Sequence, residues 1–181
     1  ACMTTAIKVI IFDFDATLTV IPEIPRYRLF PGFDDRPPDR EWLIEVAFGG
    51  KSRTDLLVQM LDALTDRWKA CLYVLSYAEK DIITRALEFA GLLGYFGEYI
   101  YGCDEVEDRF DSKGDFIADV LSKRGLSAEE ALLIDDSAKN VTSARHVCQV
   151  FLVRGGHGLR EDAMKTLISS GSAPVENDSD E

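Results

Sequence analysis

Two aspartates one residue apart, Asp13 and Asp15, directly follow an apolar run from Val9 to Phe12. Two carboxylates this close repel each other unless a cation or a shared proton separates them. A hard divalent cation is the simplest solution, because Mg2+ typically binds one or two carboxylates together with substrate phosphate. This stretch therefore indicates a metal-assisted phosphate site, and an ordinary strand followed by an acidic turn is the alternative that it leaves open.

Polar residues follow other apolar runs of the chain in the same way. Ser76 ends one such run, Asp135 and Asp136 end another, and Lys113 opens the helical segment between the two. Each is ordinary alone, as a helix cap, an acidic turn or a surface cation. Ligands of parallel α/β sheets bind beyond the carboxyl ends of the strands. Acids, a hydroxyl and an ammonium brought together at that edge suit phosphoryl transfer.

Strands and helices must alternate along the chain to position these residues. Short apolar runs predict strands over residues 9–12, 70–75, 99–101, 131–134 and 150–153. Amphipathic segments predict helices over residues 54–64, 82–90, 113–123, 141–147 and 160–168, the first of them capped by Ser52 or Thr54. The alternation predicts an α/β fold with a central parallel sheet, a three-layer α/β/α Rossmann-like arrangement in which the first strand is central.

Residues 20–53 interrupt this alternation with prolines and glycines. We interpret the stretch as an irregular flap with one short helix near residues 40–47. Its arginines fit a solvated loop. In a sharper alternative, one or two of the basic residues of this stretch meet an anionic substrate. These residues are Arg26, Arg28, Arg36, Arg40, Lys51 and Arg53.

Length and composition predict one domain over residues 3–170, because 181 residues are enough for a sizeable core. The formal net charge of −12 argues against nucleic acid as a partner. No apolar run approaches the roughly 20 residues of a membrane span, so we expect no membrane partner. Residues 171–181 predict an acidic, disordered tail. Four cysteines without metal-binding spacing fit a reducing, cytoplasmic compartment.

Four motifs in this order resemble those of the haloacid dehalogenase (HAD) superfamily. Asp13-Phe14-Asp15-Ala16-Thr17 is similar to its DxDx(T/V) signature, Leu72-Tyr73-Val74-Leu75-Ser76 to its second motif, Lys113 to its third and Leu132-Leu133-Ile134-Asp135-Asp136-Ser137 to its fourth. The match covers about residues 9–153. Any one motif would be weak evidence, and the joint occurrence of four makes the resemblance specific.

The resemblance implies a role for each motif residue. Asp13 is the expected nucleophile, which becomes an aspartyl-phosphate. Asp15 is the expected general acid/base, which protonates the leaving oxygen and later activates water. Thr17 is expected to support the substrate-binding loop, and Ser76 and Lys113 are expected to hold the phosphoryl oxygens.

The same resemblance implies a Mg2+ cofactor. Asp13, the backbone carbonyl of Asp15 and the fourth motif are the expected ligands. Within that motif Asp136 aligns with the direct ligand, and Asp135 is expected to act through water. Ala16 departs from the pattern, because many relatives have glycine there, and a methyl group at this tight turn is expected to alter its backbone angles or access.

Cap insertions in the superfamily fall after the first or the third strand, and both are short here. The second point offers only about residues 103–112, and the first only the flap. The chain therefore resembles minimally capped members, with a short flap instead of a cap domain. Their open sites accept phosphoproteins or other large substrates, or are closed by a partner subunit, which here would be a homo-oligomer.

The favoured function is a Mg2+-dependent phosphatase acting on a phosphorylated small molecule or phosphoprotein. Two alternatives stay open. A phosphotransferase or phosphomutase would use the same residues but must exclude water, normally with a lid. A catalytically idle HAD-like binding module is the second, and the retained acids argue against it.

Overall fold

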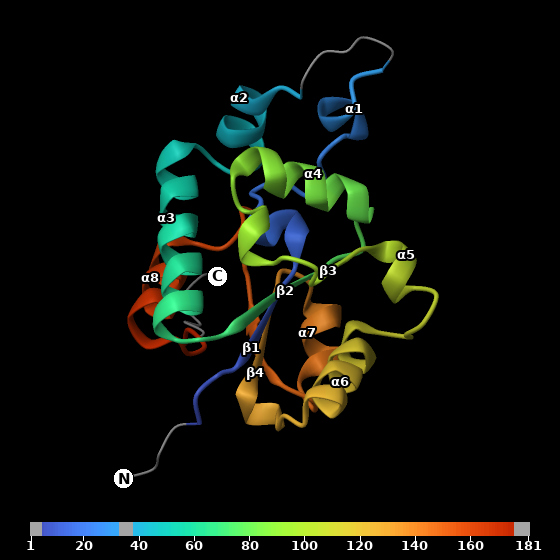
Figure 1. Cartoon of the computed structure of the whole chain (residues 1–181), viewed down its shortest axis with the longest axis vertical. Coiled ribbons are helices and arrows are strands. Elements are labelled where there is room, and N and C mark those ends of the chain that lie inside the picture. Colours follow the sequence, from blue (N-terminus) through green and yellow to red (C-terminus); the bar gives the residue numbers. More distant parts are fainter. Residues whose placement is uncertain (1–4, 33–37, 176–181) are drawn as a thin grey trace.

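A five-stranded parallel sheet forms the centre of the molecule (Figure 1). The computed structural model describes residues 5–32 and 38–175. Its strands are β1 (Val9–Phe12), β2 (Cys71–Leu75), β3 (Ile100–Tyr101), β4 (Ala131–Asp135) and β5 (Gln149–Leu152), in the order β3-β2-β1-β4-β5. The predicted parallel sheet with a central first strand is confirmed.

The register of the sheet explains why its strand ends meet. Phe12 of β1 lies opposite Val74 of β2 and Ile134 of β4, so the three strands end nearly level. All residues of β1 and β4 are buried. Burial on both faces is the physical reason for their continuous apolar runs, since a strand with one wet face would alternate.

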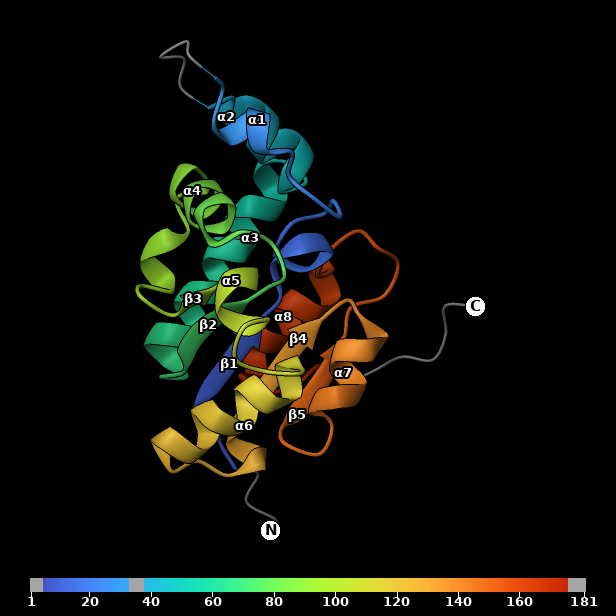
Figure 2. The ribbon, with the colours of Figure 1, turned by 90° about the vertical axis from the view of Figure 1, so that its right-hand side faces the viewer.

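Helices cover both faces of the sheet (Figures 1 and 2). Ile10 and Phe12 point to one face and pack with residues of α3 (Lys51–Asp62), α4 (Lys80–Ala90) and α8 (Glu161–Ser170). Val9 and Ile11 point to the other face, which α6 (Lys113–Arg124) and α7 (Ala138–Ala144) cover. The alternation of side chains along β1 thus produces two apolar layers.

The predicted start of the first long helix is wrong. Neither Ser52 nor Thr54 caps it, because α3 already begins at Lys51 with Gly50 as its N-cap. The Thr54 hydroxyl instead donates back to the Gly50 carbonyl at 2.9 Å. A short helix, α5 (Cys103–Val106), follows β3.

The remaining elements are short. They are α1 (Arg26–Leu29), α2 (Arg40–Trp42) and single turns at Phe14–Leu18, Leu43–Ala47, Ala63–Arg67, Leu93–Tyr95 and Ala128–Glu130. The predicted short helix near residues 40–47 is confirmed by α2 and the turn that continues it. No helix of residues 5–32 and 38–175 has the length and apolar character needed to cross a bilayer.

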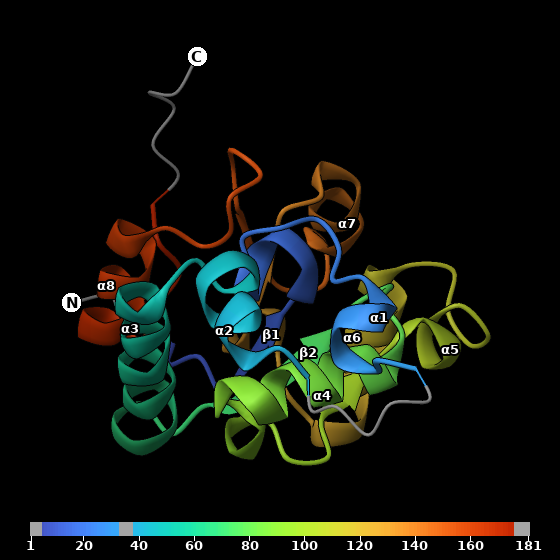
Figure 3. The ribbon, with the colours of Figure 1, turned by 90° about the horizontal axis from the view of Figure 1, so that it is seen from above.

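The described part of the flap packs against the body of the protein, where α1 lies beside α4 (Figure 3). Ile24, Leu29 and Phe48 are almost fully buried in the core layer that contains α4. Arg26 donates to Asp81 near the start of α4 at 2.6 Å and also pairs with Glu79. These apolar residues of the flap therefore contribute to the core.

Some predictions fall partly or wholly outside the described residues. Arg36 lies there, as do residues 176–181 of the predicted acidic tail, so both stay predictions. Cys71, Cys103 and Cys148 are free thiols, and Cys148 is buried.

Candidate active site

The turn Phe14–Leu18, which we call the catalytic turn, reverses the chain at the end of β1. The amide of Asp13 donates to the Ile134 carbonyl at 2.9 Å and fixes the start of the turn to β4. Ala16 has φ of 51° and ψ of 23°. This left-handed conformation costs a non-glycine residue on the order of 1–2 kcal/mol. The Ala16 amide offsets part of that cost by donating to Ile21 O at 2.8 Å and Thr19 Oγ1 at 3.0 Å.

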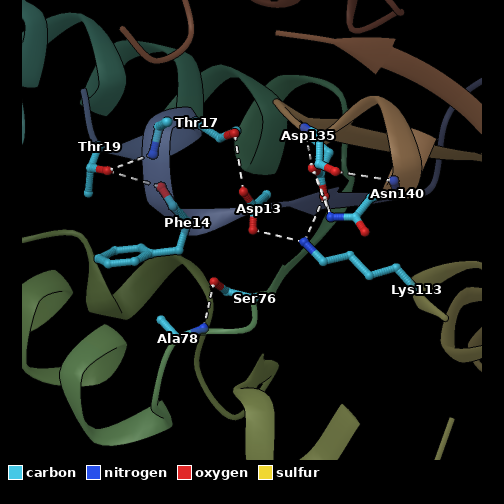
Figure 4. Close-up of polar contacts among 11 residues, drawn as sticks. Asp13, Phe14, Thr17, Thr19, Ser76, Ala78, Lys113, Asp135 and Asn140 are labelled. Atoms are coloured by element: carbon cyan, nitrogen blue, oxygen red, sulfur yellow. Dashed lines mark hydrogen bonds and ion pairs between the residues drawn. The ribbon is translucent and has the colours of Figure 1, made fainter. Parts of the chain in front are cut away.

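A buried ammonium joins the ends of two strands (Figure 4). Lys113 Nζ donates to Asp13 Oδ1 at 2.8 Å and to Asp135 Oδ2 at 2.6 Å. The side chains of Lys113 and Asp135 are fully buried, and Asp13 is 9% exposed. Burial alone would lower the pKa of Lys113, but the two carboxylates outweigh it and raise that pKa. Lys113 therefore stays charged at neutral pH. It is the first residue of α6, and the Ser112 hydroxyl caps this helix by accepting from Asp115 N at 3.1 Å.

Both carboxylate oxygens of Asp135 accept hydrogen bonds from neighbouring residues. Besides Lys113, Asp135 accepts from Ser137 N at 2.8 Å and from Asn140 Nδ2 at 3.2 Å to each oxygen. Asp136, the next residue, is only half-buried. Asn140 was not predicted as a site residue. The available signal was its position in the first turn of the helix after β4, where a buried amide needs a partner.

Three carboxylates gather at this edge. One oxygen from each of Asp13, Asp135 and Asp136 lies within 4.8 Å of the other two. Burial raises the pKa of all three groups, and Lys113 is the buried ammonium that touches two of them. A cluster of hard oxygen donors in which carboxylates outnumber the neighbouring ammonium is the environment that Mg2+ or Ca2+ prefers. The donor set thus fits a divalent cation.

Asp15 lies half-buried in the catalytic turn, and its carboxylate is outside that three-oxygen cluster. Burial is the largest cause that raises its pKa to about 7, followed by repulsion from Asp13, Glu23 and Asp136. A carboxylic acid with this pKa can release and take up a proton near neutral pH. The environment of Asp15 therefore differs from that of the lysine-paired Asp13.

Thr17 and Ser76 lie beside the acidic cluster. Thr17 Oγ1 is 3.5 Å from Asp13 Oδ2, at the outer limit of a hydrogen bond. Ser76 is buried at the end of β2, and its Oγ accepts from Ala78 N at 3.2 Å. This contact occupies a lone pair of the Ser76 oxygen and leaves its O–H group available to donate.

Comparison with known protein families identifies a match to this chain. The family model described as haloacid dehalogenase-like hydrolase matches residues 34–147, more than half of the chain. The comparison with curated proteins found no significant match to this chain.

Solved structures share the fold at low identity. A HAD-superfamily hydrolase of subfamily IA from Geobacter sulfurreducens is 17% identical with a TM-score of 0.60, over 91% of this chain and 99% of that one. A predicted phosphoglycolate phosphatase from Haemophilus somnus is 16% identical with a TM-score of 0.57, over 85% and 88%. A HAD family hydrolase from Deinococcus radiodurans, with bound phosphate and sodium, is 17% identical with a TM-score of 0.53, over 90% and 88%.

Proposed function

The chain belongs to the haloacid dehalogenase-like hydrolases, and on this premise we propose that it is a Mg2+-dependent phosphatase that forms an aspartyl-phosphate on Asp13. One observation carries the proposal. The carboxylates of Asp13, Asp135 and Asp136 converge to within 4.8 Å, and the buried Lys113 ammonium touches the first two. This arrangement supplies a nucleophile, metal ligands and a fixed cation at one point, as phosphoryl transfer requires.

Asp13, Asp136 and the backbone carbonyl of Asp15 would hold the ion directly. Asp135, whose oxygens already serve Lys113 and Asn140, would act on it through water. When bound, Mg2+ supplies positive charge that offsets the charge developing on the phosphoryl oxygens.

The chain's own residues perform the two steps of hydrolysis. A carboxylate oxygen of Asp13 forms a bond to phosphorus while the bond from phosphorus to the leaving oxygen breaks. Asp15, protonated in part because its pKa is about 7, gives its proton to that leaving oxygen. It then takes a proton from the water that attacks phosphorus, which frees Asp13 and releases phosphate.

Lys113 and Ser76 have donors left for the phosphoryl group. An ammonium has three N–H donors, and Lys113 uses one for Asp13 and one for Asp135. Its third donor and the hydroxyl of Ser76 are the groups that we assign to the phosphoryl oxygens. An ammonium and a hydroxyl donor suit a phosphoryl group whose negative charge is spread over three equatorial oxygens during transfer.

We assign the site a large substrate, such as a phosphoprotein. The described part of the flap supports this assignment, because Arg26 pairs with Glu79 and Asp81, and Arg85 Nε donates to the Leu29 carbonyl at 3.0 Å. A flap tied to α4 in this way has little freedom to swing over the site as a lid. The same pairing disfavours Arg26 as a substrate ligand.

The test is hydrolysis of an aryl phosphate by wild type, Asp13→Asn and the surface control Asp55→Asn, with and without Mg2+. Wild type and the control should release phosphate only with Mg2+, and Asp13→Asn should release none. An added alcohol or sugar acceptor distinguishes hydrolysis from transfer, and a panel of phosphopeptides and phosphorylated metabolites addresses the substrate class. Activity that persists in chelator, or in Asp13→Asn, would contradict the proposal.

A further inference from the structure

Arg53, in the first turn of α3, binds four main-chain carbonyls at once. Its Nη1 donates to Leu18 O at 2.7 Å and to Phe48 O at 3.0 Å. Its Nη2 donates to Thr17 O at 3.2 Å and to Leu159 O at 3.1 Å. One guanidinium thus joins the end of the catalytic turn, the end of the flap and the loop between β5 and α8.

The surroundings of Arg53 are unusual for an arginine. Burial is the cause that lowers its pKa to about 10, and no carboxylate pairs with it among the described residues. Leu18, Phe48 and Leu159, three of the residues whose carbonyls it binds, are almost fully buried. A buried carbonyl that loses its donor is left desolvated without a hydrogen bond, which is unfavourable. The arrangement in which Arg53 donates to all four carbonyls is therefore strongly favoured over one in which these contacts are broken.

Glycine at position 158 shows how closely these segments approach each other. Gly158 has a φ of +75°, and a Cβ there would collide with Thr19 O and lie 2.7 Å from Arg53 Nη2. Gly156, in the same loop, has a similar φ of +67° but nothing within 4 Å of a Cβ. The two glycines carry the same backbone strain when substituted, and only Gly158 touches the junction at Arg53.

We propose that Arg53 is a positioning residue that fixes the carboxyl end of the catalytic turn and thereby sets where Asp15 meets the leaving group. This inference rests on the phosphatase function proposed above. The start of the turn is fixed through Asp13 N and the Ile134 carbonyl. Its end is fixed where Thr17 O accepts from both Arg53 and Leu159 N, the latter at 2.8 Å. Asp15 lies between these two anchors.

If the carboxyl end of the catalytic turn were less tightly held, Asp15, the proposed acid, would be displaced more than Asp13, the proposed nucleophile. Asp13 is also held by Lys113, whereas the position of Asp15 depends on the turn itself. A misplacement of about 1 Å can lower a rate on the order of 10²-fold. Proton donation matters most for a poor leaving group, so the loss must be larger for an alkyl phosphate than for an activated aryl phosphate.

The experiment compares kcat and KM of Arg53→Lys, Gly158→Ala and the matched control Gly156→Ala on one alkyl and one activated aryl phosphate. The first two variants should lose about 10²-fold in kcat on the alkyl phosphate, clearly less on the aryl phosphate, with KM little changed. The control should match wild type. Guanidinium ion added to Arg53→Ala should restore part of the activity on the alkyl phosphate.

Amide hydrogen exchange supplies a readout without turnover. Residues 14–19 and Leu159 should exchange faster in Arg53→Lys, while the amides of β1 and β4 keep their protection. Unchanged exchange in the turn, or equal losses on both phosphates in an otherwise active enzyme, would overturn the role of Arg53. Wild type inactive on both phosphates would refute the phosphatase function instead.

Discussion

Replacement of Lys113 by methionine should destabilise the protein strongly in the absence of metal. The ammonium is fully buried and lies within 2.8 Å of Asp13 and 2.6 Å of Asp135. Methionine has a similar volume but no charge, so the change leaves two buried carboxylates without their cation. Breaking a buried pair by removing one partner typically costs about 3–5 kcal/mol. That is a large share of the roughly 5–15 kcal/mol that stabilises a whole domain.

The loss should depend on pH in a direction that the structure fixes. Burial raises the pKa values of Asp13 and Asp135, and attraction to Lys113 partly offsets that rise. Without Lys113 both values rise further, so the folded state binds more protons than the unfolded state and stability falls as pH increases. Lys113 itself stays charged, because its pKa is raised above the ordinary 10.5. The difference between wild type and Lys113→Met should therefore shrink as the pH falls from neutral through the raised pKa values of these two carboxyl groups.

The assay is urea unfolding in chelator at several pH values, with Lys123→Met as the matched control. Lys123 lies on the same helix, but its side chain is 74% exposed and pairs with Asp119 on the surface. The control should change the free energy of unfolding by less than about 0.5 kcal/mol. Saturating Mg2+ should return part of the loss in Lys113→Met, because about 100 Kd of a ligand adds roughly 2.7 kcal/mol. A loss equal to that of the control, or one that grows as pH falls, would refute the reasoning.

Two further predictions concern the metal ligands and the helix pair beside them. Asp136→Asn should raise the Mg2+ concentration needed for half-maximal activity and leave the melting temperature nearly unchanged. Asp135→Asn should lower the melting temperature, because Asp135 is fully buried and hydrogen-bonded. Mg2+ titration and thermal unfolding of both variants check these expectations. Gly114→Ala should cost about 1–3 kcal/mol of unfolding free energy, because its Cβ would collide with a carbonyl of α7. Gly94→Ala, where nothing lies within 4 Å, should show no comparable loss in the same urea titration.

The sequence predicted the framework of the site well for a physical reason. Strands buried on both faces read as uninterrupted apolar runs, so their ends are visible in the sequence. Asp13, Ser76 and Asp135 follow such runs and lie at the ends of β1, β2 and β4. Lys113 was found because it opens an amphipathic segment, and the structure places its ammonium between two of these strand ends.

Residues that act through main-chain contacts could not be found in this way. Arg53 looked like the other arginines of the flap, because its partners are main-chain carbonyls, which carry no side-chain signature. Two of the three segments that supply these carbonyls are also distant in sequence. The burial of apolar flap residues was not predicted for a related reason. The prolines and glycines of the flap exclude long elements, but Ile24 and Phe48 still reach the core from short turns. Ala16 was expected to alter the backbone angles or access of the turn, and it adopts a φ of 51°, in the left-handed region that glycine favours.

Covalent phosphorylation of Asp13 is the most direct test of the proposed function. Wild type and Asp15→Asn would be mixed with an activated aryl phosphate and Mg2+, quenched in acid and digested for mass spectrometry. The peptide that contains Asp13 should gain the mass of one phosphoryl group. More of it should accumulate in Asp15→Asn, because that variant lacks the base that activates water, and none should form in Asp13→Asn. Phosphate release by wild type without any modified peptide, or modification at another residue, would contradict the account.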